Sequence, residues 1–158
     1  MNNINILQSI IMPSLYSFIA SFAFCIDFNI RKSFIISASI GGLLSQVVFS
    51  LLEVNYVSEM LCYFIAALAI TAYSEIMARV LRVPVNLHLV VAVIPLVPGS
   101  MMYKSMITLI NGNTEAFLTQ TTETFGVAGS IAMGIFAVSS ITFFFKYSKK
   151  IAKTTLHK

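Results

Sequence analysis

Long apolar runs alternate with short polar connections along the whole of this chain. Each run is close to the roughly 20 residues that a helix needs to cross the hydrocarbon core of a bilayer. The connections contain turn formers such as Pro84 and residues 111–113, and none is long enough for a soluble domain. The pattern predicts an all-α integral membrane protein, one polytopic domain over 1–158, with five spans at about 5–26, 33–52, 57–78, 86–111 and 124–145.

The composition supports a membrane protein. Hydrophobic residues make up 58% of the chain and charged residues 10%, against about 25% charged in soluble domains. The basic residues lie between and after the apolar runs, so we expect a lipid bilayer around the chain and no nucleic-acid partner. Cys25 and Cys62 are isolated in apolar segments, which favours packing residues over a disulfide or a metal site. The first run lacks a basic leader and a small-residue cleavage site, so it is expected to be retained.

The charges divide the connections into two sets. The second and fourth connections carry only acids, Glu53, Glu59, Glu115 and Glu123, whereas basic residues lie in the first, the third and the tail. Since lysine and arginine favour the cytoplasmic side, we expect the N-terminus outside and the C-terminus in the cytoplasm. Lys104 is the one exception among ten basic residues. A four-span alternative makes 86–111 a re-entrant hairpin, which would place the lysine-rich tail on the opposite face, against the charge bias.

The fourth run is interrupted near its midpoint, in the segment PVNLHLVVAVIPLVPGSMMYK over residues 84–104. Pro95 and Pro98 have no N–H, so in a helix they would leave the carbonyls of Val91 and Ile94 without donors. A bilayer offers no water to satisfy such groups. The break therefore needs another partner, and a transported solute or ion is one candidate.

Two half-helices are expected on either side of the break, at about 86–94 and 100–110, because Gly99 lets the backbone turn. Ser100 is the expected N-cap of the second half, whose free N–H groups attract an anion. Lys104, one turn further, adds a full positive charge, so the segment is a candidate carboxylate site.

Tyr103 can add a hydroxyl or a stacking face to this site. The alternative interpretation is a proline kink that only shapes packing, with Lys104 reaching outward to water. Small and polar residues elsewhere, such as the Gly126, Ser130 and Gly134 face, favour close helix packing. The second run carries a patch of small and polar residues, Ser39, Gly41, Gly42, Ser45 and Gln46. Gln46 is the one expected to line a cavity, because a buried amide needs hydrogen-bond partners.

Two residues are candidates for coupling transport to protons. Glu75 lies near the end of the third run, where Arg79 can meet it on one helical face. An interfacial ion pair is the structural interpretation, and protonation of a desolvated acid is the functional one. His88 titrates near neutral pH and is expected at the cytoplasmic mouth of the fourth run.

The string VVAVIPLVPGSMMYKSMI at 90–107 resembles the threonine/serine exporter family, specifically its short YjjB-type membrane subunit. FNIRKSF at 28–34, the following glycine pair and the chain length extend the resemblance over the whole chain. The resemblance implies a proton-motive-force-driven exporter of threonine or serine, or of dicarboxylates such as succinate. It implies a larger membrane subunit as partner. The residues that match the family's motif are Pro95, Pro98, Gly99 and Tyr103.

We therefore expect a subunit of a secondary exporter in a bacterial inner membrane, working with that larger subunit or with copies of itself. A channel subunit and a non-transporting scaffold are the alternatives. An enzyme is not expected, because HExxH, GxSxG and paired intramembrane aspartates are missing from the sequence. No cofactor is expected either.

Overall fold

Helices make up the regular structure of this protein. The computed structural model describes residues 3–55 and 57–155, with side chains over 8–55 and 57–145. Its elements are α1 (Asn3–Asp27), α2 (Lys32–Val54), α3 (Glu59–Leu81), α4 (Val85–Val93), the short 3-10 helix η1 (Ile94–Leu96), α5 (Gly99–Ile110) and α6 (Thr114–Thr155). The prediction of an all-α membrane protein is confirmed.

Left-handed residues mark the ends of three helices. Asn29, with φ of 52°, follows α1, and Gly112, with φ of 77°, follows α5. Arg82 ends α3 with φ of 56°, and the N–H of Val83 then donates to the carbonyl of Ala78 at 3.1 Å. Asparagine and glycine accept this conformation readily, and arginine does so less often. These turns reverse the chain within a few residues, so successive long helices run antiparallel.

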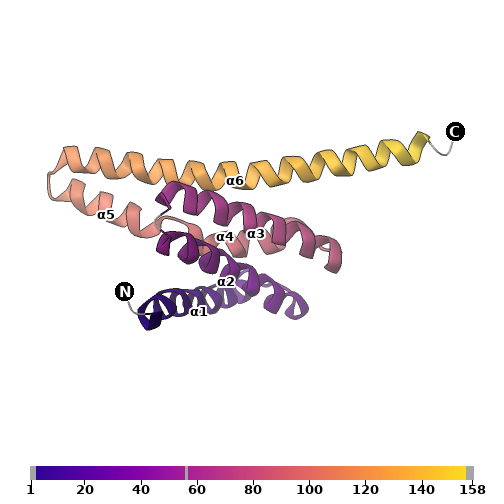
Figure 1. Ribbon diagram of the computed structural model, residues 1–158, viewed down its shortest axis with the longest axis horizontal. Helices are drawn as coiled ribbons and strands as arrows, with labels where there is room; N and C mark the ends of the chain where they lie inside the picture. The colour runs from indigo at the N-terminus through magenta and orange to yellow at the C-terminus, as the bar shows by residue number, and fades with distance from the viewer. Residues whose placement is uncertain (1–2, 56, 156–158) are drawn as a thin grey trace.

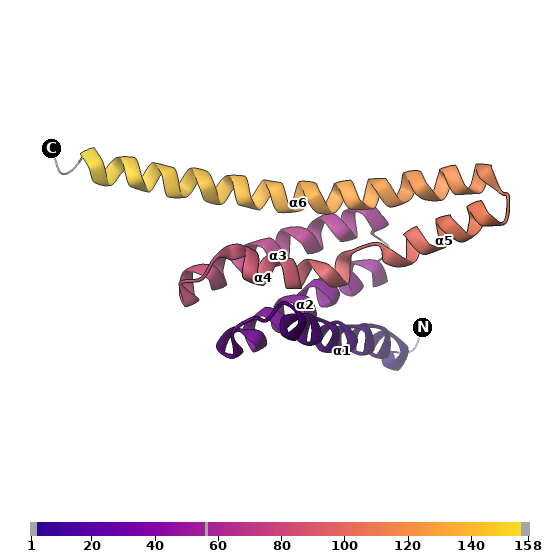
Figure 2. The same cartoon turned by 180° about the vertical axis from the view of Figure 1, so that it is seen from behind.

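The helices form a bundle with two distinct ends (Figures 1 and 2). We call the end that holds Arg31 and Arg79 the basic end, and the end that holds Glu53 and Glu59 the acidic end. α2, α3 and α4 pack together in the middle, with α1 against α2 on one side and α6 against α3 on the other. The charge segregation seen in the sequence is therefore also a segregation in space.

Four helices are long and apolar enough to cross a membrane, namely Gln8–Asp27, Lys32–Val54, Glu59–Leu81 and Thr114–Phe145. The pair Val85–Leu96 and Gly99–Ile110, bent by 46°, is a fifth candidate as one broken span. α5 continues away from the basic end, where α4 begins, and finishes beyond the acidic end (Figure 1). A re-entrant hairpin would return to the basic end, so this arrangement favours the crossing over the four-span alternative.

α6 is longer than the sequence pattern predicts, because it begins at Thr114 rather than near 124 and has 42 residues. At 1.5 Å per residue it is about 60 Å long. Residues 114–123 are too polar to be predicted as part of a membrane span. They contain neither proline nor glycine, so they can still form a helix. Asn113 also caps the helix, its Oδ1 accepting the N–H of Ala116 at 3.1 Å. α5 and the first turns of α6 therefore extend past the acidic ends of α2 and α3 (Figure 1).

Small side chains fill the interior and large apolar side chains cover the outside. The main core cluster is built from Ala66, Ala67, Ile70, Ala92, Leu96, Val127 and Ile131. Large hydrophobic residues such as Ile36, Phe125 and Phe136 are exposed, as expected for a surface that lies in lipid. A Cβ on Gly134 would lie 2.8 Å from Ala67 of α3, which supports the packing interpretation of the small-residue face on α6.

Candidate functional site: the broken helix and the polar residues around it

The break between α4 and α5 is a short stretch of tight turns. Pro95 is the second residue of η1, and Pro98 directly precedes α5 with φ of −76° and ψ of 53°. The N–H of Val97 donates to the carbonyl of Ile94 at 3.2 Å, and the N–H of Gly99 donates to Val97 at 2.7 Å. These local bonds replace the helical ladder that two prolines cannot complete.

Two details of the sequence prediction are wrong. The carbonyl of Ile94 is not freed by Pro98, because the 3-10 turn gives it the N–H of Val97. Ser100 is not the N-cap of the second half-helix, because α5 begins at Gly99 and Pro98 takes the capping position without a side-chain hydrogen bond. Proline, with φ already fixed, sets the start of α5 two residues earlier than a cap at Ser100 would.

The predicted solute-site residues divide between two environments. Pro98 is buried and Pro95 is half-buried against the bundle. Ser100, Tyr103 and Lys104 share one exposed face of α5, and Tyr103 is 67% exposed. α5 packs on α6 through an adjoining face, where Oγ1 of Thr108, one turn after Lys104, lies 3.0 Å from Oε1 of Gln120. The side chains of Ser100, Tyr103 and Lys104 stay exposed in the single chain.

Gln46 lies elsewhere, in the interface between α1 and α2. Its Nε2 donates to Oγ of Ser50 at 3.3 Å, and its Oε1 accepts from Oγ of Ser17 of α1 at 3.5 Å. Gly42, one turn away on α2, leaves so little space that an added Cβ would collide with Ser21. The structure thus places Gln46 in a tight polar seam and does not bring it beside Lys104.

Glu75 and Arg79 form the ion pair expected from their spacing. Oε2 of Glu75 lies 3.6 Å from a guanidinium nitrogen of Arg79, near the basic end of α3. The carboxylate is mostly buried, while the arginine side chain is 56% exposed and reaches out of the bundle. The pair thus connects a buried carboxylate to the surface at this end.

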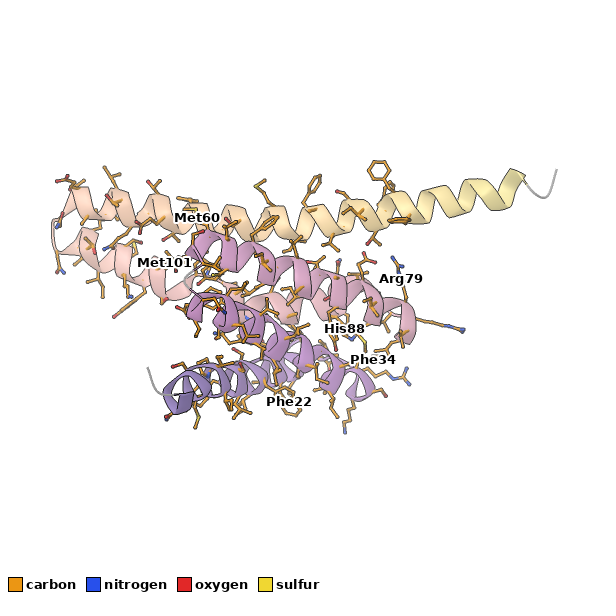
Figure 3. The ribbon with its side chains drawn as sticks, viewed as in Figure 1. Phe22, Phe34, Met60, Arg79, His88 and Met101 are labelled. Carbon is orange, nitrogen blue, oxygen red and sulfur yellow. The ribbon has the colours of Figure 1, made fainter. Side chains whose placement is uncertain are left out.

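His88 is buried rather than lying open at the end of the bundle. It sits in the first turn of α4 with 0% of its surface exposed. Figure 3 shows it toward the same end as Phe34 and Arg79, with Met60 and Met101 at the opposite end. Its Nε2 lies 2.9 Å from Oγ of Ser37 on α2.

Tyr73 on α3 joins the contact between His88 and Ser37, because its hydroxyl donates to the carbonyl of Ser37 at 2.7 Å. We call Ser37, Tyr73 and His88 the junction. Three helices therefore meet through polar contacts one to two turns inside the basic end. Sequence reasoning missed Ser37 and Tyr73. The available signal was the spacing of Ser37 and Gly41, which places both on the α2 face that meets α4.

Hollows open at both ends of the broken span. One of about 390 Å³ at the basic end is lined by α4 residues, including Leu87 and Val91, and by the α1–α2 turn. Another of about 270 Å³ at the acidic end lies between Met60 of α3, Met101 of α5 and Val127 of α6. Each half of the interrupted helix therefore borders a hollow at its own end.

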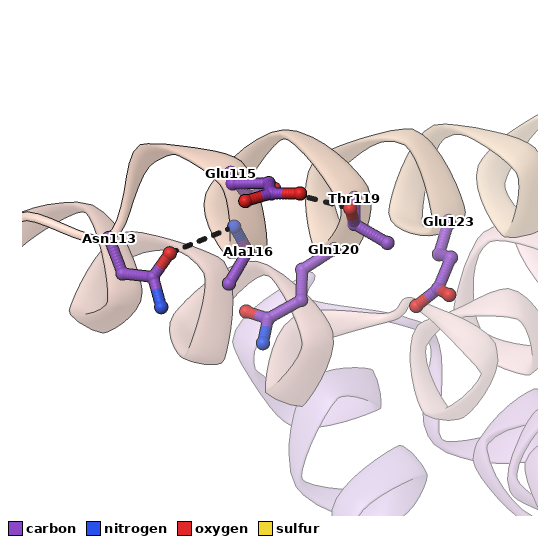
Figure 4. A pocket seen from close by; sticks show the side chains of 6 residues that line it. All are labelled: Asn113, Glu115, Ala116, Thr119, Gln120 and Glu123. Carbon is purple, nitrogen blue, oxygen red and sulfur yellow. Dashed lines mark hydrogen bonds between the residues drawn. The ribbon is translucent and has the colours of Figure 1, made fainter.

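A third hollow, of about 480 Å³, lies on the polar first turns of α6 (Figure 4). Its lining includes Glu115, Thr119 and Glu123 and contains no residue of the break. Acidic side chains there repel a carboxylate, and the groove does not reach the break. We therefore place the candidate site at the broken helix and not here.

Comparison with known proteins gives one match. The model of the family described as threonine/serine exporter, ThrE, matches residues 13–141. This range contains the whole of α2 through α5 and most of α1 and α6. No curated protein and no solved structure matches the chain.

Proposed function

Because this chain belongs to the threonine/serine exporter family, we propose that it is one subunit of a proton-driven secondary exporter of small polar metabolites. The chain is a multi-pass membrane protein of the threonine/serine exporter type. The observation that carries the proposal is the family match over 13–141, which includes the interrupted span. The proposed solutes are threonine, serine or a dicarboxylate such as succinate.

The broken span is the proposed solute path. A break within a spanning helix exposes backbone polar groups and a helix N-terminus where a solute can bind. The N-terminus of α5 and the charge of Lys104 both favour a carboxylate, and Ser100 and Tyr103 lie on the same face. The hollows next to α4 and α5 give a solute an approach from each end.

A second subunit is proposed to cover the α5 face that the single chain leaves open. Ser100, Tyr103 and Lys104 are exposed there, so a site built from them needs a wall from another protein. The larger membrane subunit of the same exporter family is the proposed partner, with a second copy of this chain as the alternative. A solute held between subunits is protected from lipid on all sides.

The proposed setting is a bacterial inner membrane, with the N-terminus outside and the basic end in the cytoplasm. Arg31, Lys32, Arg79 and Arg82 lie at that end, which supports this orientation. Glu75 and His88 are the proposed coupling residues, and both lie toward the same end. A cytoplasmic position suits groups that exchange protons with the cell interior.

Efflux measurements test the proposal. Cells loaded with labelled threonine, serine or succinate are compared with and without this chain, with and without the partner subunit, and with and without an uncoupler. We expect efflux that needs this chain and stops when the proton gradient collapses. Downhill efflux that persists with the uncoupler would indicate a channel, and no difference for any solute would contradict export altogether.

A further inference from the structure

The contacts of Ser37 link its hydroxyl to the tautomer of His88. A serine hydroxyl has one hydrogen. Ser37 donates it to the carbonyl of Phe34 at 2.9 Å, one turn earlier in α2. Nε2 of His88 lies 2.9 Å from the same hydroxyl, and either atom of this contact can be the donor. While Ser37 keeps its bond to Phe34, Nε2 donates, and the neutral ring is the Nε2–H tautomer.

This tautomer leaves Nδ1 of His88 with a bare lone pair. Nδ1 is buried and has no hydrogen-bond partner among the described residues. Buried acceptors are normally satisfied, and an unsatisfied one in a protein interior calls for an explanation. Here the acceptor belongs to the one side chain type whose ordinary pKa lies close to neutral pH. Proton uptake at Nδ1 converts this acceptor into an N–H donor and gives the ring a positive charge.

Contacts from two other helices hold the ring in place. Tyr73 on α3 donates to the carbonyl of Ser37, which ties α3 to the α2 turn that accepts from His88. Gly41, one turn along α2, lets Ala92 of α4 approach so closely that an added Cβ would lie 2.9 Å from it. The side of α4 that carries His88 is thus pressed against α2, and the ring cannot turn freely.

A hollow of about 390 Å³ lies at the basic end, on a neighbouring side of α4. It is lined by Leu87 and Val91, and His88 is not part of its lining. The ionisable groups that the neighbouring helices carry toward this end are Cys25, Asp27, Arg31, Lys32, Tyr73, Glu75, Arg79 and Arg82. Of these, Tyr73 is linked to His88 through Ser37, and Glu75 pairs with Arg79.

We propose that Nδ1 of His88 carries the coupling proton of this exporter, with Ser37 as the positioning residue that fixes the tautomer. The inference rests on the proposed proton-driven export. A proton from the outer aqueous phase adds to the Nδ1 lone pair and gives the imidazolium. It leaves to the cytoplasm in the second half of the cycle, and no other bond forms or breaks.

His88→Gln is the sharpest variant, because the glutamine amide nitrogen can still donate to Ser37 while the titrating Nδ1 is lost. His157→Gln is the matched control, a replacement at the other histidine, which lies outside the described residues. Both are assayed in vesicles that contain the full chain and its partner, with the labelled solute that the wild type moves. Two assays are compared, namely solute exchange without a proton gradient and accumulation driven by one.

We expect His88→Gln to keep the wild-type exchange rate while gradient-driven accumulation falls to a ratio of about 1, the value without coupling. His157→Gln should keep both. Gradient-driven accumulation that survives in His88→Gln would overturn the inference, and so would loss of both assays at normal membrane abundance. If the wild type shows no gradient-driven accumulation, the proposed coupling itself fails, and the wild-type arm alone reveals this.

A spectroscopic measurement tests the tautomer without any transport assay. In the His157→Gln background one histidine remains, and ¹⁵N NMR of the protein in bilayers reports which ring nitrogen is protonated. We expect Nε2–H in the neutral ring, and a mixture of tautomers after Ser37→Ala. An Nδ1–H tautomer, or a ratio unaffected by Ser37→Ala, would overturn the role given to Ser37.

Discussion

At the scale of single residues, close approach of α1 and α2 depends on a missing side chain. A Cβ on Gly42 would collide with Ser21, whereas one on Gly129 in α6 would meet nothing within 4 Å. We predict that Gly42→Ala lowers the free energy of unfolding by about 1–3 kcal/mol, because the packed seam cannot absorb the methyl group. Thermal unfolding in detergent measures this.

Gly129→Ala is the matched control for Gly42→Ala. It should leave stability unchanged or raise it by up to about 1 kcal/mol, because alanine favours a helix over glycine. Combining Gly42→Ala with Ser21→Gly should restore much of the loss. Equal melting temperatures for Gly42→Ala and the wild type would show that the seam is looser than the structure has it.

Lys104 is the residue on which the proposed carboxylate site depends most. It lies on the exposed face of α5 with Ser100 and Tyr103. We predict that Lys104→Met raises the KM for efflux of a carboxylate solute by about tenfold or more, since a charge-assisted hydrogen bond is lost. Lys32→Met at the basic end is the control and should leave KM unchanged. Undiminished transport by Lys104→Met would remove this lysine from the site.

At the scale of elements, hydropathy and proline spacing predicted the helices and the break, and they failed where contacts are long-range. Hydropathy did not predict the polar turns at 114–123 as helix, because a helix outside lipid needs no apolar run. The junction of Ser37, Tyr73 and His88 joins residues up to 51 positions apart, which no local pattern encodes. The N-cap of α5 was misplaced by two residues, because Pro98 outweighed the capping preference of Ser100.

The broken pair α4 and α5 should behave as a single crossing. In a background with Cys25 and Cys62 replaced by alanine, we predict that Asn113→Cys reacts with a membrane-impermeant thiol reagent added outside. Arg82→Cys, at the other end of the pair, should react only after the membrane is permeabilised. Labelling of both positions from one side would contradict the crossing and restore the re-entrant hairpin.

At the scale of the whole molecule, the face proposed to bind the solute lies exposed on the single chain. α6 contacts only α3 and α5 among the element pairs with substantial contact, and the Lys104 face of α5 has no cover. Large apolar side chains surround the outside, so lipid or another subunit must meet them. The proposed exporter is therefore an assembly, in which this chain supplies the broken helix.

Mass measurement in the membrane-extracted state tests assembly. We predict that the active species has a mass above the 17.4 kDa of one chain, through the partner subunit or further copies. Native mass spectrometry from detergent, with efflux measured on the same preparation after reconstitution, makes the comparison. Full transport by a species of a single chain's mass would contradict the assembly.

The central claim is that solute passes along the interrupted helix, and removal of the interruption tests it most directly. The double variant Pro95→Ala and Pro98→Ala restores two N–H donors and lets α4 and α5 join as one helix. Pro13→Ala, at a proline inside α1, is the matched control. At equal membrane abundance and with the partner present, we predict that labelled efflux is lost in the double variant and kept in Pro13→Ala. Wild-type efflux from the double variant would show that the break serves packing alone.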